Sequence, residues 1–140
     1  TSCLARPYDD QSIRRNAIEG EAILAMLEMA ERGELSILVS EVVAEEIRRT
    51  RNDLRRQQLE DVAALASAVV PLTSEVHNRG ADLQRRGFKP FDALHLAAAE
   101  LAGVDCLCTA DDRMRKRAAR QPDLKVRVVS ILDLFQELQA

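Results

Sequence analysis

Short apolar runs alternate along the chain with longer stretches in which apolar residues recur every three or four positions. The runs at 35–39, 105–109 and 126–129 predict strands. The run at 69–72 contains Pro71, which restricts it to an edge strand at best. The helical spacing predicts helices over about 9–32, 40–54, 54–69, 73–87 and 90–103, in the basic segment after Thr109, and from Ser130 to the C-terminus.

Residues with special backbone preferences stand at the predicted helix ends. Gly33 and Gly103 are natural stops, Pro90 suits a first helical turn, and Ser40 occupies a capping position. The alternation of strands and helices implies βαβ units. We therefore predict an α/β domain with three layers, α/β/α, and a mostly parallel sheet. The first helix is expected to bury one stripe of residues, namely Ile13, Ala17, Gly20, Leu24 and Leu27.

The composition fits one soluble domain. The chain has 140 residues, of which 46% are hydrophobic and 31% charged, so it can bury a core and is neither disordered nor membrane-spanning. No signal peptide is recognisable, and the three cysteines fit neither a disulfide framework nor a zinc site. We expect a cytoplasmic protein, without membrane association, whose thiols are reduced.

Three acidic residues follow predicted strands at positions where α/β folds build their sites. Asp111 comes just after the strand ending at Thr109, and Asp112 stands beside it. Glu46 lies about a turn and a half into its helix, and Asp92 lies in the first turn of another. Carboxylates that converge in this way select a hard ion such as Mg²⁺ or Mn²⁺, which can promote phosphodiester hydrolysis without a protein nucleophile.

Each of these carboxylates also has a purely structural interpretation. Asp92, Asp111 or Asp112 could cap a helix, and Glu46 or its neighbour Glu45 could be solvated surface charge. His95 is interpreted as a packed or hydrogen-bonded residue. No Ser/His/Asp set, glycine-rich phosphate loop or Cys/His ligand spacing is present in the sequence. Only the convergence of the carboxylates favours a metal site.

The net charge of −3 argues against a general electrostatic attraction to nucleic acid. Arginine and lysine nevertheless form two runs, at 48–56 and 113–120. Each run could be a solvated helix face, or a basic rim around an acidic site. In the second interpretation, Arg113, Lys116 or Arg48 guides a phosphate backbone.

Four segments carry a resemblance to a known family. They are residues 1–10 (TSCLARPYDD), 40–47 (SEVVAEEI), 91–99 (FDALHLAAA) and 108–112 (CTADD). Together they resemble the motifs of PIN-domain proteins, and the third segment followed by the fourth is the most specific feature. The resemblance spans essentially the whole chain. Among the members of the family, the chain is similar to the small VapC-like ribonuclease toxins of toxin–antitoxin pairs.

The resemblance implies a metal-dependent endoribonuclease that uses Mg²⁺ or Mn²⁺. By motif, Glu46, Asp92 and Asp111 would be the acidic site, with Asp112 as a fourth metal ligand and Glu46 preferred over Glu45. The substrate-binding residues would be Ser2, Thr109, Arg113 and Lys116. The implied partners are RNA, a cognate antitoxin protein and a second copy of the chain in a homodimer.

The family's first strand, which ends in a catalytic aspartate directly before the Thr-Ser pair, is not part of this sequence, which starts at Thr1. Residues 1–140 are therefore expected to form a single PIN-like domain that is N-terminally incomplete. The open explanations are a shortened chain, an incomplete sequence, or a protein that fills this position in another way.

Two other functions are weighed against the nuclease. One is a catalytically inactive PIN-like module that binds RNA or a protein. The other is a response-regulator-like α/β domain, which is disfavoured because the chain starts with a helix and lacks a phospho-acceptor aspartate at the end of a central strand.

Overall fold

Helices and short parallel strands alternate along the chain in the computed structural model, which describes residues 2–139. This arrangement confirms the predicted α/β class. The elements are α1 (Ser2–Ala5), η1 (Arg6–Tyr8), α2 (Arg14–Glu31), β1 (Leu38–Ser40), α3 (Glu41–Arg48), α4 (Asp53–Ala63), β2 (Ala68–Val70), α5 (Ser74–Arg85), α6 (Pro90–Ala102), β3 (Cys106–Thr109), α7 (Asp112–Ala119), β4 (Arg127–Ser130) and α8 (Ile131–Gln139).

The strands pair in parallel, as predicted, but they are divided between two sheets. Strand β1 pairs with β2, with Leu38 opposite Ala68, and β3 pairs with β4, with Cys106 opposite Arg127. Within residues 2–139 these are two separate two-stranded sheets rather than one. The edges of β1 and β3 that are not used in these pairs border one cavity of about 540 Å³, which is lined mainly by apolar side chains.

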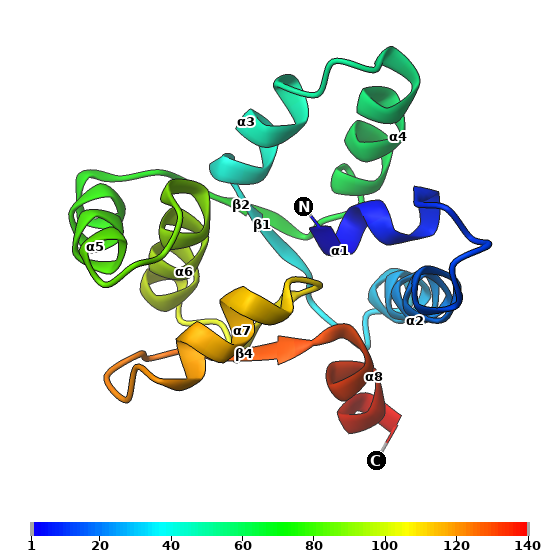
Figure 1. Ribbon diagram of the computed structural model, residues 1–140. Helices are drawn as coiled ribbons and strands as arrows, with labels where there is room; N and C mark the ends of the chain where they lie inside the picture. The colour runs from blue at the N-terminus through cyan, green and yellow to red at the C-terminus, as the bar shows by residue number, and fades with distance from the viewer. Residues whose placement is uncertain (1, 140) are drawn as a thin grey trace.

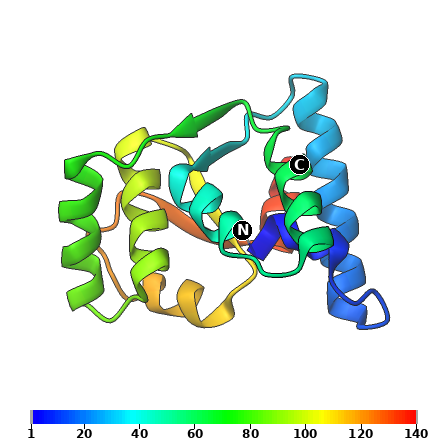
Figure 2. The same ribbon diagram turned by 90° about the horizontal axis from the view of Figure 1, so that it is seen from above.

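Helices cover the strands from opposite sides. The paired helices α5 and α6 lie at one end of the molecule, and α2 and α8 lie together at the other (Figure 1, Figure 2). The buried side chains form two clusters. One centres on Ile23, Met26 and Ile47, and the other on Leu83, Leu96 and Phe88. No helix within residues 2–139 is long and apolar enough to span a bilayer.

Helix α2 buries Gly20 and Leu27 of the predicted stripe, but the rest of its buried face is different. Ile13 is 52% exposed and Leu24 is 50% exposed, whereas Ile23 and Met26 are buried. The buried face also contains the charged side chain of Glu19, of which only 3% is exposed. Arg6 and Arg15 pair with Glu19 at 2.9 and 3.1 Å, and these ion pairs offset the cost of burying its charge.

The structure also corrects the predicted end of the helix over 54–69. The helical spacing predicts a helix extending to Val69, but α4 ends at Ala63 and Val69 lies in strand β2. Val69 and Val70 are branched at Cβ and pair with β1, so sheet formation overrides the helical spacing.

Helix α3 ends at Arg48 rather than near residue 54, since Asn52 caps the separate helix α4, and α2 begins at Arg14 rather than near residue 9. The short helices α1 and η1 were not predicted. The other element ends differ from the predicted ones by no more than three residues.

Candidate functional site

Four carboxylates line the cavity between the two sheets, namely those of Glu46, Asp92, Asp105 and Asp111. Asp105 precedes β3, at the opposite end of that strand from Asp111, whereas the other three come from the elements that follow strands or start a helix. Glu46 comes from α3, Asp92 from the first turn of α6, and Asp111 from the junction between β3 and α7. Asp111 caps α7 by accepting hydrogen bonds from the backbone N–H groups of Arg113 and Met114, at 2.9 and 3.2 Å. The three acidic residues that the sequence singles out thus lie along one cavity, and Asp92 is close enough to Asp111 and Glu46 for their charges to raise its pKa.

Glu46 faces the site through a contact with His95. Its Oε1 atom lies 2.7 Å from Nε2 of His95, which is 14% exposed and lines the same cavity. The interpretation of His95 as a hydrogen-bonded residue is confirmed, but its place beside the carboxylates was missed. The signal that could have found it is its spacing, since His95 lies three residues after Asp92 and therefore on the same face of α6.

The neighbouring Glu45 is occupied elsewhere. Its carboxylate pairs with Arg48 and, at 2.9 Å, with Arg49 on the surface of α3. Two further arginines of the first basic run are also paired, because Arg55 contacts Asp9 and Arg56 contacts Asp53. This run is thus largely neutralised by local ion pairs.

The pKa of Asp92 is affected by the other two carboxylates. Burial raises its pKa above the ordinary value, and the negative charges of Asp111 and Glu46 raise that pKa further. The positive charges of His95 and Lys89 oppose the rise in the pKa of Asp92. Carboxylates that repel one another in a partly buried site are stabilised by a cation.

The raised pKa predicts that Asp92→Asn will stabilise the metal-free protein at neutral pH. A carboxyl group whose folded-state pKa exceeds its unfolded value contributes stability below about pH 4, and that stability is lost as the pH rises through the raised pKa. We expect the Tm of the variant at pH 7 to exceed that of the natural protein by about 1–3 °C, with the difference disappearing near pH 4.

Thermal unfolding in EDTA between pH 4 and 8 measures this difference. Glu60→Gln, on the exposed side of α4, removes a carboxylate remote from the cavity and serves as the control. An unchanged or lower Tm for Asp92→Asn at pH 7 would show that the three charges do not strain the site.

The carboxylate oxygens of the site suit a hard divalent cation, although they do not lie close enough together to surround one. Within residues 2–139, no group of three or more His, Cys, Asp or Glu side chains is close enough to hold a metal ion as it stands. The oxygen donors of Glu46, Asp92 and Asp111 nevertheless have the chemistry that Mg²⁺ or Mn²⁺ requires. Their mutual repulsion around a shared cavity also fits a cation.

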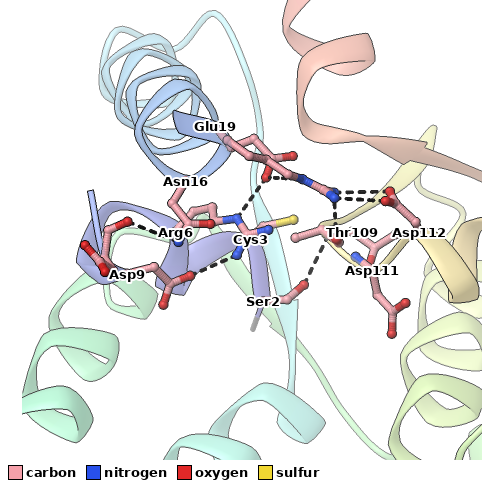
Figure 3. A network of polar contacts seen from close by, with 12 residues as sticks. Ser2, Cys3, Arg6, Asp9, Asn16, Glu19, Thr109, Asp111 and Asp112 are labelled. Atoms are coloured by element: carbon pink, nitrogen blue, oxygen red, sulfur yellow. Dashed lines mark hydrogen bonds and ion pairs between the residues drawn. The ribbon is translucent and has the colours of Figure 1, made fainter. Parts of the chain in front are cut away.

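Asp112 belongs to a different network. Arg15 binds both of its carboxylate oxygens, at 2.9 and 3.1 Å, and lowers its pKa. Arg15 also contacts Glu19, which connects through Arg6 to Asp9 (Figure 3). In the same view the carboxylate of Asp111 points away from this network (Figure 3). The proposed fourth metal ligand is therefore not brought together with the other three.

Ser2 and Thr109 hold the turn that carries Asp111. The hydroxyl of Ser2 accepts a hydrogen bond from the backbone N–H of Ala110 at 3.2 Å. The hydroxyl of Thr109 accepts one from the backbone N–H of Asp111 at 3.0 Å. Both residues line the large cavity, so these two predicted substrate-binding residues also fix the backbone at the site.

The two predicted basic residues lie on α7. Arg113 is exposed and lines a smaller pocket together with Asp92 and Asp111. Lys116 is exposed one turn further along α7, and within residues 2–139 it belongs to neither pocket.

The fold and the site together define an α/β domain with an acidic site at the carboxyl ends of parallel strands. The sequence matches the PIN domain over residues 8–120, and the chain belongs to the PIN-domain family. No curated protein matches the chain. PIN domains are generally nucleases that depend on divalent metal ions, so the protein has a nuclease-type fold.

Proposed function

We propose that this protein is a metal-dependent endoribonuclease in which Glu46, Asp92 and Asp111 hold Mg²⁺ or Mn²⁺. The observation that carries the proposal is the convergence of these carboxylates, from three elements far apart in sequence, on one cavity. Membership of the PIN-domain family supports it. A bound divalent ion lowers the pKa of water and neutralises charge that develops on a phosphate.

The chain's own residues would orient these groups. His95 holds Glu46 through the 2.7 Å contact, and the cap of α7 fixes the carboxylate of Asp111. Ser2 and Thr109 fix the backbone next to Asp111. Such fixed geometry is what hydrolysis by positioned carboxylates requires.

We also infer that a further parallel strand completes the domain between β1 and β3. The cavity of about 540 Å³ lies between their unpaired edges, and the Oγ atom of Ser40 is buried there without a hydrogen-bond partner among residues 2–139. Leu38, which lines this cavity from β1, is 38% exposed. Ser2 lies at the carboxyl end of β3, so a strand leading into Thr1 would run parallel to β3 and end beside the carboxylates. An aspartate at its end would complete the acidic site.

The finer biological role is a ribonuclease toxin that a cognate antitoxin inhibits in the cytoplasm. The sequence motifs support this role, and exposed apolar side chains support a protein partner. Ile18 and Leu24 on α2 are 45% and 50% exposed, and Leu132 on the adjacent α8 is 42% exposed. A homodimer is the other proposed assembly, and light scattering would measure its mass.

Metal-dependent cleavage of a mixed RNA pool tests the main proposal. We expect residues 1–140, extended with the proposed strand ending in aspartate, to cut RNA in Mn²⁺ or Mg²⁺, to stop in EDTA, and to resume when the ion is restored. Persistent cleavage in EDTA would contradict the proposal. RNA or protein binding without any cleavage would favour the alternative, a catalytically inactive PIN-like module.

A further inference from the structure

A second pocket lies beside two of the acidic residues. Its volume is about 140 Å³, and Asp92 and Asp111 line both this pocket and the larger cavity. The remaining polar and backbone lining comes from the turn before α6 and from α7, namely Gly87, Lys89, Arg113 and Arg117. The two aspartates therefore line both a mainly apolar cavity and a smaller pocket with three cationic side chains.

Within the part of the chain that the structure describes, the cations of this pocket form no ion pairs. Among residues 2–139, Lys89, Arg113 and Arg117 form no salt bridge with a carboxylate within 4.0 Å. Their neighbours do, since Arg115 pairs with Asp112 and Arg86 pairs with Asp123. Three positive charges thus face the two aspartates, and Lys89 already lowers the pKa of Asp92.

A glycine lets one of these cations lie close to the backbone. A Cβ atom at Gly87 would lie only 2.6 Å from Nη1 of Arg117. Gly87 also has a φ of +104°, a conformation that other residues rarely adopt. A side chain at position 87 would therefore displace the guanidinium group from its place at the pocket.

We propose that this pocket binds a phosphate group of the RNA strand next to the phosphodiester that is cut. Lys89, Arg113 and Arg117 would be the ligands. The inference rests on the proposed nuclease function for the position of the cut, but not for the binding of phosphate. Guanidinium groups suit phosphate oxygens because of their planar set of N–H donors. Cations outnumber carboxylates in the pocket by three to two, which favours an anion there.

RNA binding in EDTA tests the pocket without any cleavage. We expect Arg117→Gln in the full chain to weaken the binding of a fluorescent single-stranded RNA about threefold to fivefold. The slope of log K against log salt should fall by about 0.7, as for one lost phosphate contact. Arg120→Gln is the matched control, because Arg120 lies at the end of the same helix and outside the pocket lining. Its affinity and slope should remain those of the natural protein.

Glycine variants test the placement of the guanidinium while keeping its charge. Gly87→Ala should weaken RNA binding as Arg117→Gln does. Gly103→Ala should not, because Gly103 also has a positive φ of +69° but has nothing within 4 Å of its added Cβ. Both variants are measured below the onset of thermal unfolding, so that a loss of fold is not counted as a loss of binding.

The outcomes separate this inference from the proposed function. If Arg117→Gln and Arg120→Gln bind RNA alike, the pocket is not a phosphate site, even if the protein cuts RNA with metal. If Arg117→Gln lowers the affinity and slope while no variant cuts RNA, the phosphate site stands and the nuclease proposal fails. Inorganic phosphate should compete with RNA for the natural protein. Competition without any effect of Arg117→Gln on RNA affinity would indicate a free-anion site and overturn the inference.

Discussion

In the protein extended with the proposed strand, Asp92→Asn and Asp111→Asn should each lower RNA cleavage at least about 100-fold, since each removes a carboxylate that the proposed metal ion needs. The substitutions change charge more than shape. An asparagine at position 111 can still cap α7 through its side-chain oxygen, because asparagine is as good an N-cap residue as aspartate. Loss of cleavage would therefore report the missing charge rather than a melted helix.

The adjacent pair on α3 supplies a matched comparison. Glu46→Gln should reduce cleavage strongly, whereas Glu45→Gln should leave it unchanged, because Glu45 is paired with Arg48 and Arg49 on the helix surface. Initial rates at saturating Mn²⁺, with circular dichroism to verify the fold, give both numbers. Equal losses at the two positions, or full activity in Asp92→Asn, would rule out the proposed ligand set.

Asp112→Asn decides the status of the remaining acidic residue. Its contacts with Arg15 place it in the ion-pair network with α2, so we expect cleavage to fall far less than in Asp111→Asn. A loss as large as that of Asp111→Asn would instead assign Asp112 to the metal.

The positions of the candidate carboxylates could be predicted from neighbouring residues in the sequence. The contacts that these carboxylates make with residues far along the chain could not. Asp92 follows Pro90 at a helix start, and Asp111 follows a strand, so both positions can be inferred from their neighbours. The contact between Glu46 and His95 joins residues 49 positions apart, and no local pattern indicates it. The same holds for the contact of Arg15 with Asp112, which lies 97 positions away. This contact keeps the carboxylate of Asp112 apart from those of Glu46, Asp92 and Asp111.

The face of α2 shows a further limit of hydrophobic periodicity. A stripe through Leu24 has helical spacing, but so does the buried face that contains Ile23 and Met26. The second face buries Glu19, which a pattern of apolar residues would place in solvent. Its burial depends on ion pairs with Arg6 of η1 and with Arg15, which the apolar pattern does not indicate.

Adding a strand that ends in aspartate before Thr1 should raise metal-dependent cleavage at least about 100-fold over residues 1–140 alone. The strand would contribute the fourth carboxylate and pair with both β1 and β3. It would also fill the cavity of about 540 Å³ with apolar side chains, each worth about 1.5–3 kcal/mol when fully buried. We expect the Tm to rise by about 10 °C.

Two extensions separate the strand from its carboxylate. An extension of about six β-branched residues ending in Asp should raise both the Tm and the cleavage rate. The same extension ending in Asn should raise the Tm equally but leave cleavage low, because it fills the cavity without adding a ligand. Thermal unfolding and cleavage of the same RNA pool, measured on both proteins, give the comparison. If neither extension changes the Tm, no strand enters between β1 and β3, and the exposed side of Leu38 must be covered in another way.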